Sequence, residues 1–203
     1  MKNDRIRFLS VTGLLVALVV LLGLTPIGLL HVGPIYVTLL CIPVIVGTLL
    51  LGLEAGILLG FAFGSVSFYV GMTAPSPLVM PVVQHNMLYL IVLCYFPRLL
   101  LPLICQIVYR LAGRGKRGKT AVILSALAGS LTNTVFYLGL LLIFYIIIGL
   151  DHMAILGTLS SIVLFAGIPE AIAAAVVAVP VISAINKAGL SFKYTQKKEN
   201  KSA

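Results

Sequence analysis

The chain has 203 residues, of which 61% are hydrophobic and only 9% are charged, and its mean hydropathy is +1.17. A soluble domain is closer to half apolar and a quarter charged, so this composition excludes an ordinary soluble fold. The net charge is +9, and thirteen of the 14 Lys and Arg residues fall in the segments 2–7, 110–119 and 187–201. Such clusters are typical of the cytoplasmic segments of membrane proteins, where they also attract anionic lipid headgroups, and they do not indicate a nucleic-acid surface.

Long apolar runs predict six membrane-spanning helices. In chain order, their approximate bounds are 8–24, 36–52, 54–71, 88–112, 121–149 and 160–186. A bilayer core of about 30 Å needs about 20 apolar helical residues. With the N-terminus inside, alternate crossings put every basic cluster, including the tail 187–203, on the cytoplasmic side. We therefore predict an all-α polytopic membrane protein, with a single domain over 1–203, one bundle of six transmembrane helices and both termini cytoplasmic.

Three outer connections follow from this topology: 25–35, 72–87 and 150–159. They are rich in Pro and Gly, and parts of them are too apolar for solvated loops. Irregular backbone near lipid is tolerated only where protein or a cavity satisfies its polar groups. We therefore expect the segment 72–87 to fold onto the outer mouth of the bundle.

The basic loop GRGKRGKT, at 113–120, matches the pattern of a phosphate-binding loop. A working loop of that kind lies between a strand and a helix of an α/β domain. Here a membrane helix precedes it and another follows. We interpret it as a cytosolic turn that does not bind nucleotide.

Small residues form two helical stripes. In the third span, Gly52, Gly56, Gly60 and Gly64 recur at every fourth residue, which lets another helix backbone approach closely. In the first span, Gly13 and Ala17 form a further pair near the cytosolic side. Internal packing explains the first stripe best, whereas the second is equally consistent with packing inside the bundle and with docking of a partner subunit.

The fifth span contains the polar sequence GSLTNT, which includes Ser130, Thr132, Asn133 and Thr134. Ser and Thr can return their hydroxyls to the helix backbone at little cost. A carboxamide cannot satisfy all its groups in that way. We expect Asn133 to contact a ligand or cavity, with packing between helices as the alternative.

Arg98 and Glu170 lie inside predicted spans, where ionisable groups are costly and by default functional. At about 1.5 Å per residue, four residues lie at similar heights above the cytosolic ends of their spans: Arg98 at about 21 Å, Asn133 at about 18 Å, Glu170 at about 24 Å and Phe68 at about 22 Å. This shared level in the outer half of the bilayer is where an outward-facing pocket would lie. A structural Arg98–Glu170 ion pair would explain two of these residues without a ligand.

The chemistry of this level predicts the ligand. Arg98 offers a planar fork of donors suited to a carboxylate or a phosphate, and Asn133 suits an amide or a hydroxyl. If Arg98 is not engaged by Glu170, the ligand should be small, polar and anionic. We predict no catalytic and no metal site, and a substrate-binding set that comprises Arg98, Asn133, Phe68, Glu170, Tyr137, Tyr69 and His85.

With these residues in view, the chain resembles the substrate-binding S components of energy-coupling factor (ECF) vitamin transporters. The similar segments follow one another through nearly the whole chain: TPIGLLHVGPIYVTLLCIPVIVGTLLLG at 25–52, LGFAFGSVSF at 59–68, FPR at 96–98, GSLTNT at 129–134 and GIPEAIAAAVV at 167–177. The pantothenate type is the most similar.

The resemblance implies a membrane subunit that binds a vitamin at its outer face and delivers it inward by rotating in the membrane. It implies a transmembrane coupling subunit and two cytosolic ATPases as partners; these would use ATP and Mg²⁺, while this chain binds no cofactor itself. Family members dock through an A-x-x-x-A pattern on the first span, whose matching positions here are Gly13 and Ala17. We expect the protein in the cell (plasma) membrane of a bacterium.

Other functions compete with this one. A stand-alone secondary transporter of a small organic anion would need ion-coupling groups, and Glu170 is the one intramembrane candidate in the sequence. An S component could also carry another vitamin or precursor, such as pyridoxine or a thiamine precursor. A membrane enzyme is disfavoured because the shared level offers one acid and no histidine, and a purely structural subunit would bind no ligand.

Overall fold

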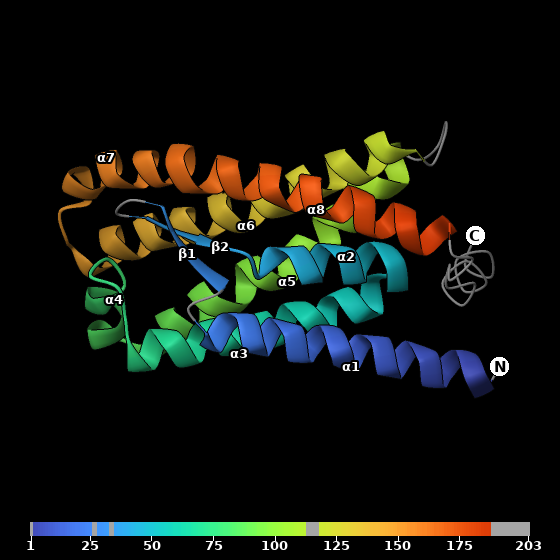
Figure 1. The fold of residues 1–203 in the computed structure, drawn as a ribbon. Coiled ribbons are helices and arrows are strands. Elements are labelled where there is room, and N and C mark those ends of the chain that lie inside the picture. The colour runs from blue at the N-terminus through green and yellow to red at the C-terminus, as the bar shows by residue number, and fades with distance from the viewer. Residues whose placement is uncertain (1, 26–27, 33–34, 113–117, 188–203) are drawn as a thin grey trace.

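The structure is a computed structural model that describes residues 2–25, 28–32, 35–112 and 118–187. Long helices run side by side along one axis (Figure 1). The first four long helices are α1 (Lys2–Leu24), α3 (Leu53–Thr73), α5 (Met87–Ala112) and α6 (Lys119–Ile148). The last part of the bundle begins with α7 (His152–Ile162). This helix continues through the π-helical turn η2 (Val163–Gly167) into α8 (Ile168–Lys187). Within the described ranges, five helical stretches are long and apolar enough to cross a membrane. The prediction of an all-α polytopic membrane protein is confirmed.

The second predicted span differs from the structure. Helix α2 (Cys41–Leu51) has 11 residues, and it follows an antiparallel hairpin of β1 (Leu29–Val32) and β2 (Ile35–Thr38). The prediction of one helical span over 36–52 is therefore wrong in its first part. The sequence IYVT of β2 consists of β-branched and aromatic residues, which favour strands, and an apolar run alone does not distinguish the two structures. At about 16 Å, α2 crosses only about half of a bilayer core.

The connections at the far end of the bundle are more ordered than loops. The segment after α3 contains the short helix α4 (Met80–His85), and the Tyr145 hydroxyl of α6 donates a 2.8 Å hydrogen bond to the Leu78 carbonyl. The segment 72–87 thus folds onto the bundle, as predicted. The prediction of a loop over 150–159 is wrong, because α7 starts at His152. A carboxylate oxygen of Asp151 accepts a 3.1 Å hydrogen bond from the Met153 N–H, which caps this helix.

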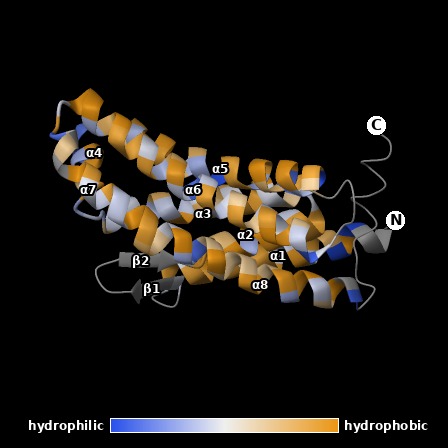
Figure 2. Cartoon of the chain, turned by 90° about the horizontal axis from the view of Figure 1, so that it is seen from above, coloured by the Kyte–Doolittle hydropathy of each residue, from blue (hydrophilic) through white to orange (hydrophobic). Residues whose placement is uncertain are grey.

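The start of α1 and the end of α8 lie at the same end of the bundle (Figure 1). Figure 2 shows that hydrophobic residues cover the middle of these helices, while hydrophilic residues gather where α1 begins and α8 ends. This distribution agrees with an even number of crossings. The cytoplasmic side of that end remains a prediction from the charge distribution.

The glycine stripe of α3 packs inside the bundle. A Cβ atom on Gly60 would lie 2.5 Å from the Arg98 carbonyl oxygen of α5, and one on Gly64 would lie 2.8 Å from the Tyr95 ring. Residue 102 is a proline, whose missing N–H leaves the Arg98 carbonyl without its helical hydrogen bond. Glycine at position 60 lets the α3 backbone come close to this carbonyl.

Two apolar clusters form the core. One joins α1, α2, α3 and α8 with parts of α5 and α6, and it includes Val44, Leu59 and Ala174. The other joins α4, α5, α6 and α7 and includes Val82, Leu93 and Leu141. On α5, Leu93 and Cys94 belong to the second cluster and Leu101 to the first. Arg98 is therefore located between the two clusters.

Gly60→Ala should destabilise the protein, because its new methyl group would press on backbone that cannot move away. We expect a loss of about 1–3 kcal/mol in the free energy of unfolding, as for other overpacked cores, measured as a lower thermal midpoint in detergent. Gly139→Ala is the matched control, since a Cβ there meets nothing within 4 Å. Equal midpoints for the two variants would contradict the close α3–α5 contact.

Candidate ligand-binding site

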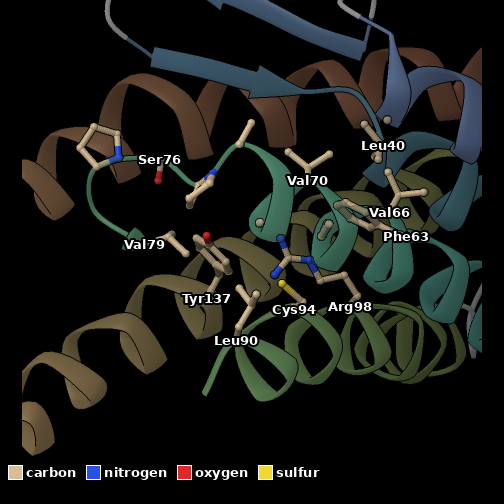
Figure 3. Close-up of a pocket in the computed structure, with 16 residues that line it drawn as sticks. Leu40, Phe63, Val66, Val70, Ser76, Val79, Leu90, Cys94, Arg98 and Tyr137 are labelled. Carbon is tan, nitrogen blue, oxygen red and sulfur yellow. The ribbon is translucent and has the colours of Figure 1, made fainter. Parts of the chain in front are cut away.

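A cavity of about 500 Å³ opens between α3, α5, α6 and the segment after α3 (Figure 3). Cavities of this size are typical of small-molecule sites. Most of its lining is apolar. One face of α3 and one face of α5 contribute half of the lining residues. On α3 these are Phe63, Val66, Ser67, Val70 and Gly71, and on α5 they are Leu90, Cys94 and Arg98. The remaining lining residues are Gly23, Leu40, Ala74, Pro75, Ser76, Pro77, Val79 and Tyr137.

The Arg98 guanidinium is held by its own helix. Its Nη1 donates a 2.9 Å hydrogen bond to the Leu93 carbonyl. That carbonyl would normally accept a bond from the N–H of residue 97, but Pro97 has none. Pro97 thus leaves a buried acceptor open one turn before Arg98. The helix α5 continues through Pro97 without a break, so the proline supplies a partner for the arginine and does not end the helix.

Two aromatic rings cover the guanidinium (Figure 3). Its central carbon lies 4.6 Å from the Tyr137 ring centroid and 5.1 Å from that of Phe63, and the residue is 8% exposed. Such cation–π contacts contribute about 2 kcal/mol each when desolvated. Arg98 Nε has no hydrogen-bond partner among the described residues. Because the two rings lie over the guanidinium plane, a ligand would approach the guanidinium at its N–H edge. The parallel N–H groups of such an edge match the two oxygens of a carboxylate.

The segment 74–79 covers the cavity. Five of its residues line the cavity, and the bond from Tyr145 to the Leu78 carbonyl ties it to α6. Behind it, the Tyr89 ring stacks on Phe144 at 4.7 Å and on His85 at 5.8 Å. The hydrogen bond from Tyr145 therefore ties the segment to α6, and Leu78 and Val79 also pack in the apolar cluster of α5 and α6.

The structure brings together only part of the predicted set. Arg98 and Tyr137 line the cavity, whereas the other five predicted contacts do not: Asn133, Phe68, Glu170, Tyr69 and His85. Tyr69 and His85 are exposed, and Phe68 packs beside the Tyr95 ring at 6.3 Å. Residues at the same depth in the membrane can face different directions around the bundle axis. The sequence does not specify that direction. The contact of these five residues with ligand stays a prediction.

A buried polar cluster lies next to the site. On α6, Thr132 and Thr134 return their hydroxyls to the backbone, as expected, but Ser130 Oγ and Asn133 Oδ1 have no partner among the described residues. The Cys41 thiol at the start of α2 lies beside Ser130 and beside the Glu170 carboxyl of α8. Ser130, at the Cys41 thiol, is thus near a buried acid.

Sequence reasoning missed Phe63 and the lining segment 74–79. Phe63, Val66, Val70 and Ala74 follow the spacing of one helical face, so periodicity on α3 could have identified Phe63. No comparable signal marks the segment 74–79, because its position depends on contacts with α5 and α6.

Gly13 and Ala17 are both exposed on α1, and a Cβ on Gly13 would meet nothing within 4 Å. Position 13 therefore contacts no other helix of the described chain. Of the two alternatives left by the sequence, packing inside the bundle is excluded for Gly13.

Comparison with known proteins decides the family. The model of the family "ECF transporter, substrate-specific component" matches residues 7–185, which is most of the chain. The chain belongs to this family. It is also 28% identical over 155 residues to the pantothenic acid transporter PanT of Lactococcus lactis subsp. cremoris (strain MG1363), covering 71% of this chain and 77% of that protein.

Membership of this family means that the chain is a transporter subunit and not an enzyme. It also implies association with an ECF module. The earlier resemblance to S components is confirmed.

Tyr145→Phe should loosen the segment over the cavity, since it removes the hydroxyl that holds the Leu78 carbonyl. We expect a thiol placed at the exposed position Ser76, as Ser76→Cys, to react about fivefold faster with a water-soluble reagent, as the loss of about 1 kcal/mol predicts. The measurement is the labelling rate of the detergent-purified protein.

Tyr95→Phe is the matched control for this experiment, because its hydroxyl bonds Ser65 at 3.1 Å on the α3–α5 interface and not the segment. An unchanged labelling rate in Tyr145→Phe would contradict the proposed tie.

Proposed function

We propose that this chain is the pantothenate-binding subunit of an ATP-driven importer and that Arg98 recognises the carboxylate of the vitamin. The observation that carries the proposal is a buried guanidinium that lines a largely apolar cavity of about 500 Å³ and whose Nε–H has no hydrogen-bond partner among the described residues. The 28% identity to a pantothenic acid transporter supports the choice of vitamin.

Pantothenate fits the chemistry of this cavity. It carries one carboxylate, one amide and two hydroxyls on a short carbon chain. Among the described residues that line the cavity, Arg98 alone carries a charge. One fixed cation suits a monocarboxylate, whereas a phosphate monoester with a charge near −2 would remain undercompensated in this low-dielectric site. Asn133, whose Oδ1 is unpaired, is proposed to bind the amide or a hydroxyl after local adjustment.

Transport requires other subunits. We propose a transmembrane coupling subunit and two cytosolic ATPases, which supply the nucleotide chemistry, and rotation of the loaded subunit in a bacterial cell membrane as the transport step. The exposed pair Gly13 and Ala17 on α1 is proposed as the docking surface. Its open backbone suits a closely packed partner helix.

Arg98→Ala should weaken pantothenate binding by at least about 100-fold, because removing one partner of a buried charged contact costs about 2–5 kcal/mol. Arg98→Lys should not restore it, since an ammonium lacks the planar fork. The measurement is binding of radiolabelled pantothenate to the purified protein. Asn133→Ala should also abolish binding while the protein stays folded.

Arg110→Ala is the control, since this arginine is exposed in the last turn of α5. Other B vitamins serve as competitors in the same assay, and preferential competition by one of them would reassign the substrate. Unchanged affinity in Arg98→Ala would refute the proposed site. Loss of folding in that variant would instead favour a structural role for this residue.

Gly13→Leu and Ala17→Leu should leave pantothenate binding intact but block uptake by the full complex, because a large side chain would hold the partner helix away. Uptake into reconstituted vesicles measures this effect. Val176→Leu adds bulk at another exposed helix position, on α8, and should not affect uptake. Transport that survives both α1 changes would show that docking uses another surface.

A further inference from the structure

Polar side chains are rare among the described residues that line the cavity. Besides Arg98, the side chains with an O–H group there are Ser67 of α3, Ser76 of the covering segment and Tyr137 of α6. Cys94 adds a thiol, which is a weak donor and a weak acceptor. A ligand that carries neutral polar groups beside its carboxylate therefore meets few side chains that can form hydrogen bonds with them.

Tyr137 is in direct contact with the charged group of the site. Its ring centroid lies 4.6 Å from the central carbon of the Arg98 guanidinium. The hydroxyl belongs to the same ring, so the length of one phenol ring limits its distance from the guanidinium. Figure 3 shows the Tyr137 side chain beside Arg98, with its hydroxyl oxygen on the side of the segment that carries Ser76. A ligand group that follows the carboxylate by a few bonds thus comes within reach of this hydroxyl.

The Tyr137 hydroxyl makes no hydrogen bond to another described residue. Two other tyrosines of the bundle differ in this respect: the Tyr145 hydroxyl donates to the Leu78 carbonyl at 2.8 Å, and the Tyr95 hydroxyl pairs with that of Ser65 at 3.1 Å. A tyrosine O–H that is withdrawn from bulk water usually has a partner. Tyr137 is half-buried and lines the cavity, so its hydroxyl is available to a ligand.

The other two hydroxyls of the lining are in different positions. Ser76 is exposed, so bulk water can satisfy its hydroxyl. On α3, the Phe63 ring contacts the guanidinium at 5.1 Å, and Ser67 lies one turn beyond it, toward Gly71, which packs on the Leu90 side chain. Among the three hydroxyl-bearing residues, Tyr137 is therefore the one with a measured contact to Arg98.

The order of polar groups along pantothenate matches this arrangement. Its amide is the first neutral polar group after the carboxylate, at a distance of two CH₂ groups, and its hydroxyls lie farther along the chain. With the carboxylate at Arg98, the amide carbonyl is an acceptor near the phenol O–H of Tyr137. A fatty acid of the same length would place a CH₂ group there and leave the hydroxyl without a partner, which is costly in a desolvated site.

We propose that Tyr137 is a specificity-determining residue with two separable roles: its ring contacts Arg98, and its hydroxyl donates a hydrogen bond to the amide carbonyl of the ligand. This rests on the proposed function for the position of the ligand carboxylate. The site thereby selects carboxylates that carry a carbonyl a few bonds from the anionic end. Asn133, one turn away on α6, is then assigned to a hydroxyl of the ligand.

Tyr137→Phe separates the two roles, because it keeps the ring over Arg98 and removes only the hydroxyl. One neutral hydrogen bond corresponds to about threefold to tenfold in affinity. We therefore expect this variant to bind pantothenate about threefold to tenfold more weakly than the wild type. The measurement is calorimetric titration of the purified full-length chain in detergent.

A second ligand isolates the contact with the amide. In the isostere used for this purpose, a trans CH=CH unit replaces the amide of pantothenate, so the carboxylate, the chain length and the hydroxyls remain while the carbonyl acceptor is lost. Tyr137→Phe should bind this isostere as the wild type does. The ratio of the affinities for pantothenate and isostere should therefore fall by about threefold to tenfold in the variant. A merely structural role of the hydroxyl would weaken both ligands alike and leave this ratio unchanged.

Two further variants serve as controls. Tyr95→Phe also removes a phenol oxygen, but this one pairs with Ser65 and does not line the cavity, so both ligands should bind as to the wild type. Ser67→Ala removes the other half-buried hydroxyl of the lining and should leave the affinity ratio unchanged.

The outcomes are distinct. An unchanged affinity ratio in Tyr137→Phe would overturn this inference, whether both ligands bind as before or both are weakened, and pantothenate binding by the wild type would leave the proposed function intact. A lower ratio in Ser67→Ala, with none in Tyr137→Phe, would assign the amide contact to α3 and also overturn it. Absence of pantothenate binding by the wild type would overturn the proposed function, and this inference with it.

Discussion

The buried guanidinium of Arg98 is the constraint on which the rest of the site depends. A cation at this depth needs partners that neither lipid nor water supplies. Pro97 provides one by leaving the Leu93 carbonyl open, and the rings of Phe63 and Tyr137 provide two more. These partners come from α3, α5 and α6, so the position of one side chain requires the correct packing of three helices.

The same region explains the shape of the cavity. Arg98 lies where the two apolar clusters meet, and residues of both clusters line the cavity. Close packing of α3 on α5 through Gly60 and Gly64 brings the α3 face to the arginine. At the other end, the segment 74–79 closes over the ring of lining residues. An apolar container with one polar edge is well suited to a small molecule that has an anionic end and a short carbon chain.

The division of labour between subunits agrees with these features. As a substrate-specific component of an ECF transporter, the chain must bind a substrate and have a membrane-compatible exterior, and its long apolar helices provide that exterior.

The sequence by itself determined the membrane class, the long helices and the position of Arg98 within one of them, because hydrophobic runs, basic clusters and an isolated charge are local properties. It could not separate the strand β2 from helix α2, since both are apolar, nor recognise α7 in a segment read as a loop. It predicted one depth for Phe68, Asn133 and Arg98, but rotation about each helix axis decides which side chain meets the cavity. Only tertiary packing fixes that rotation, and it places Phe63 and the segment 74–79 at the cavity.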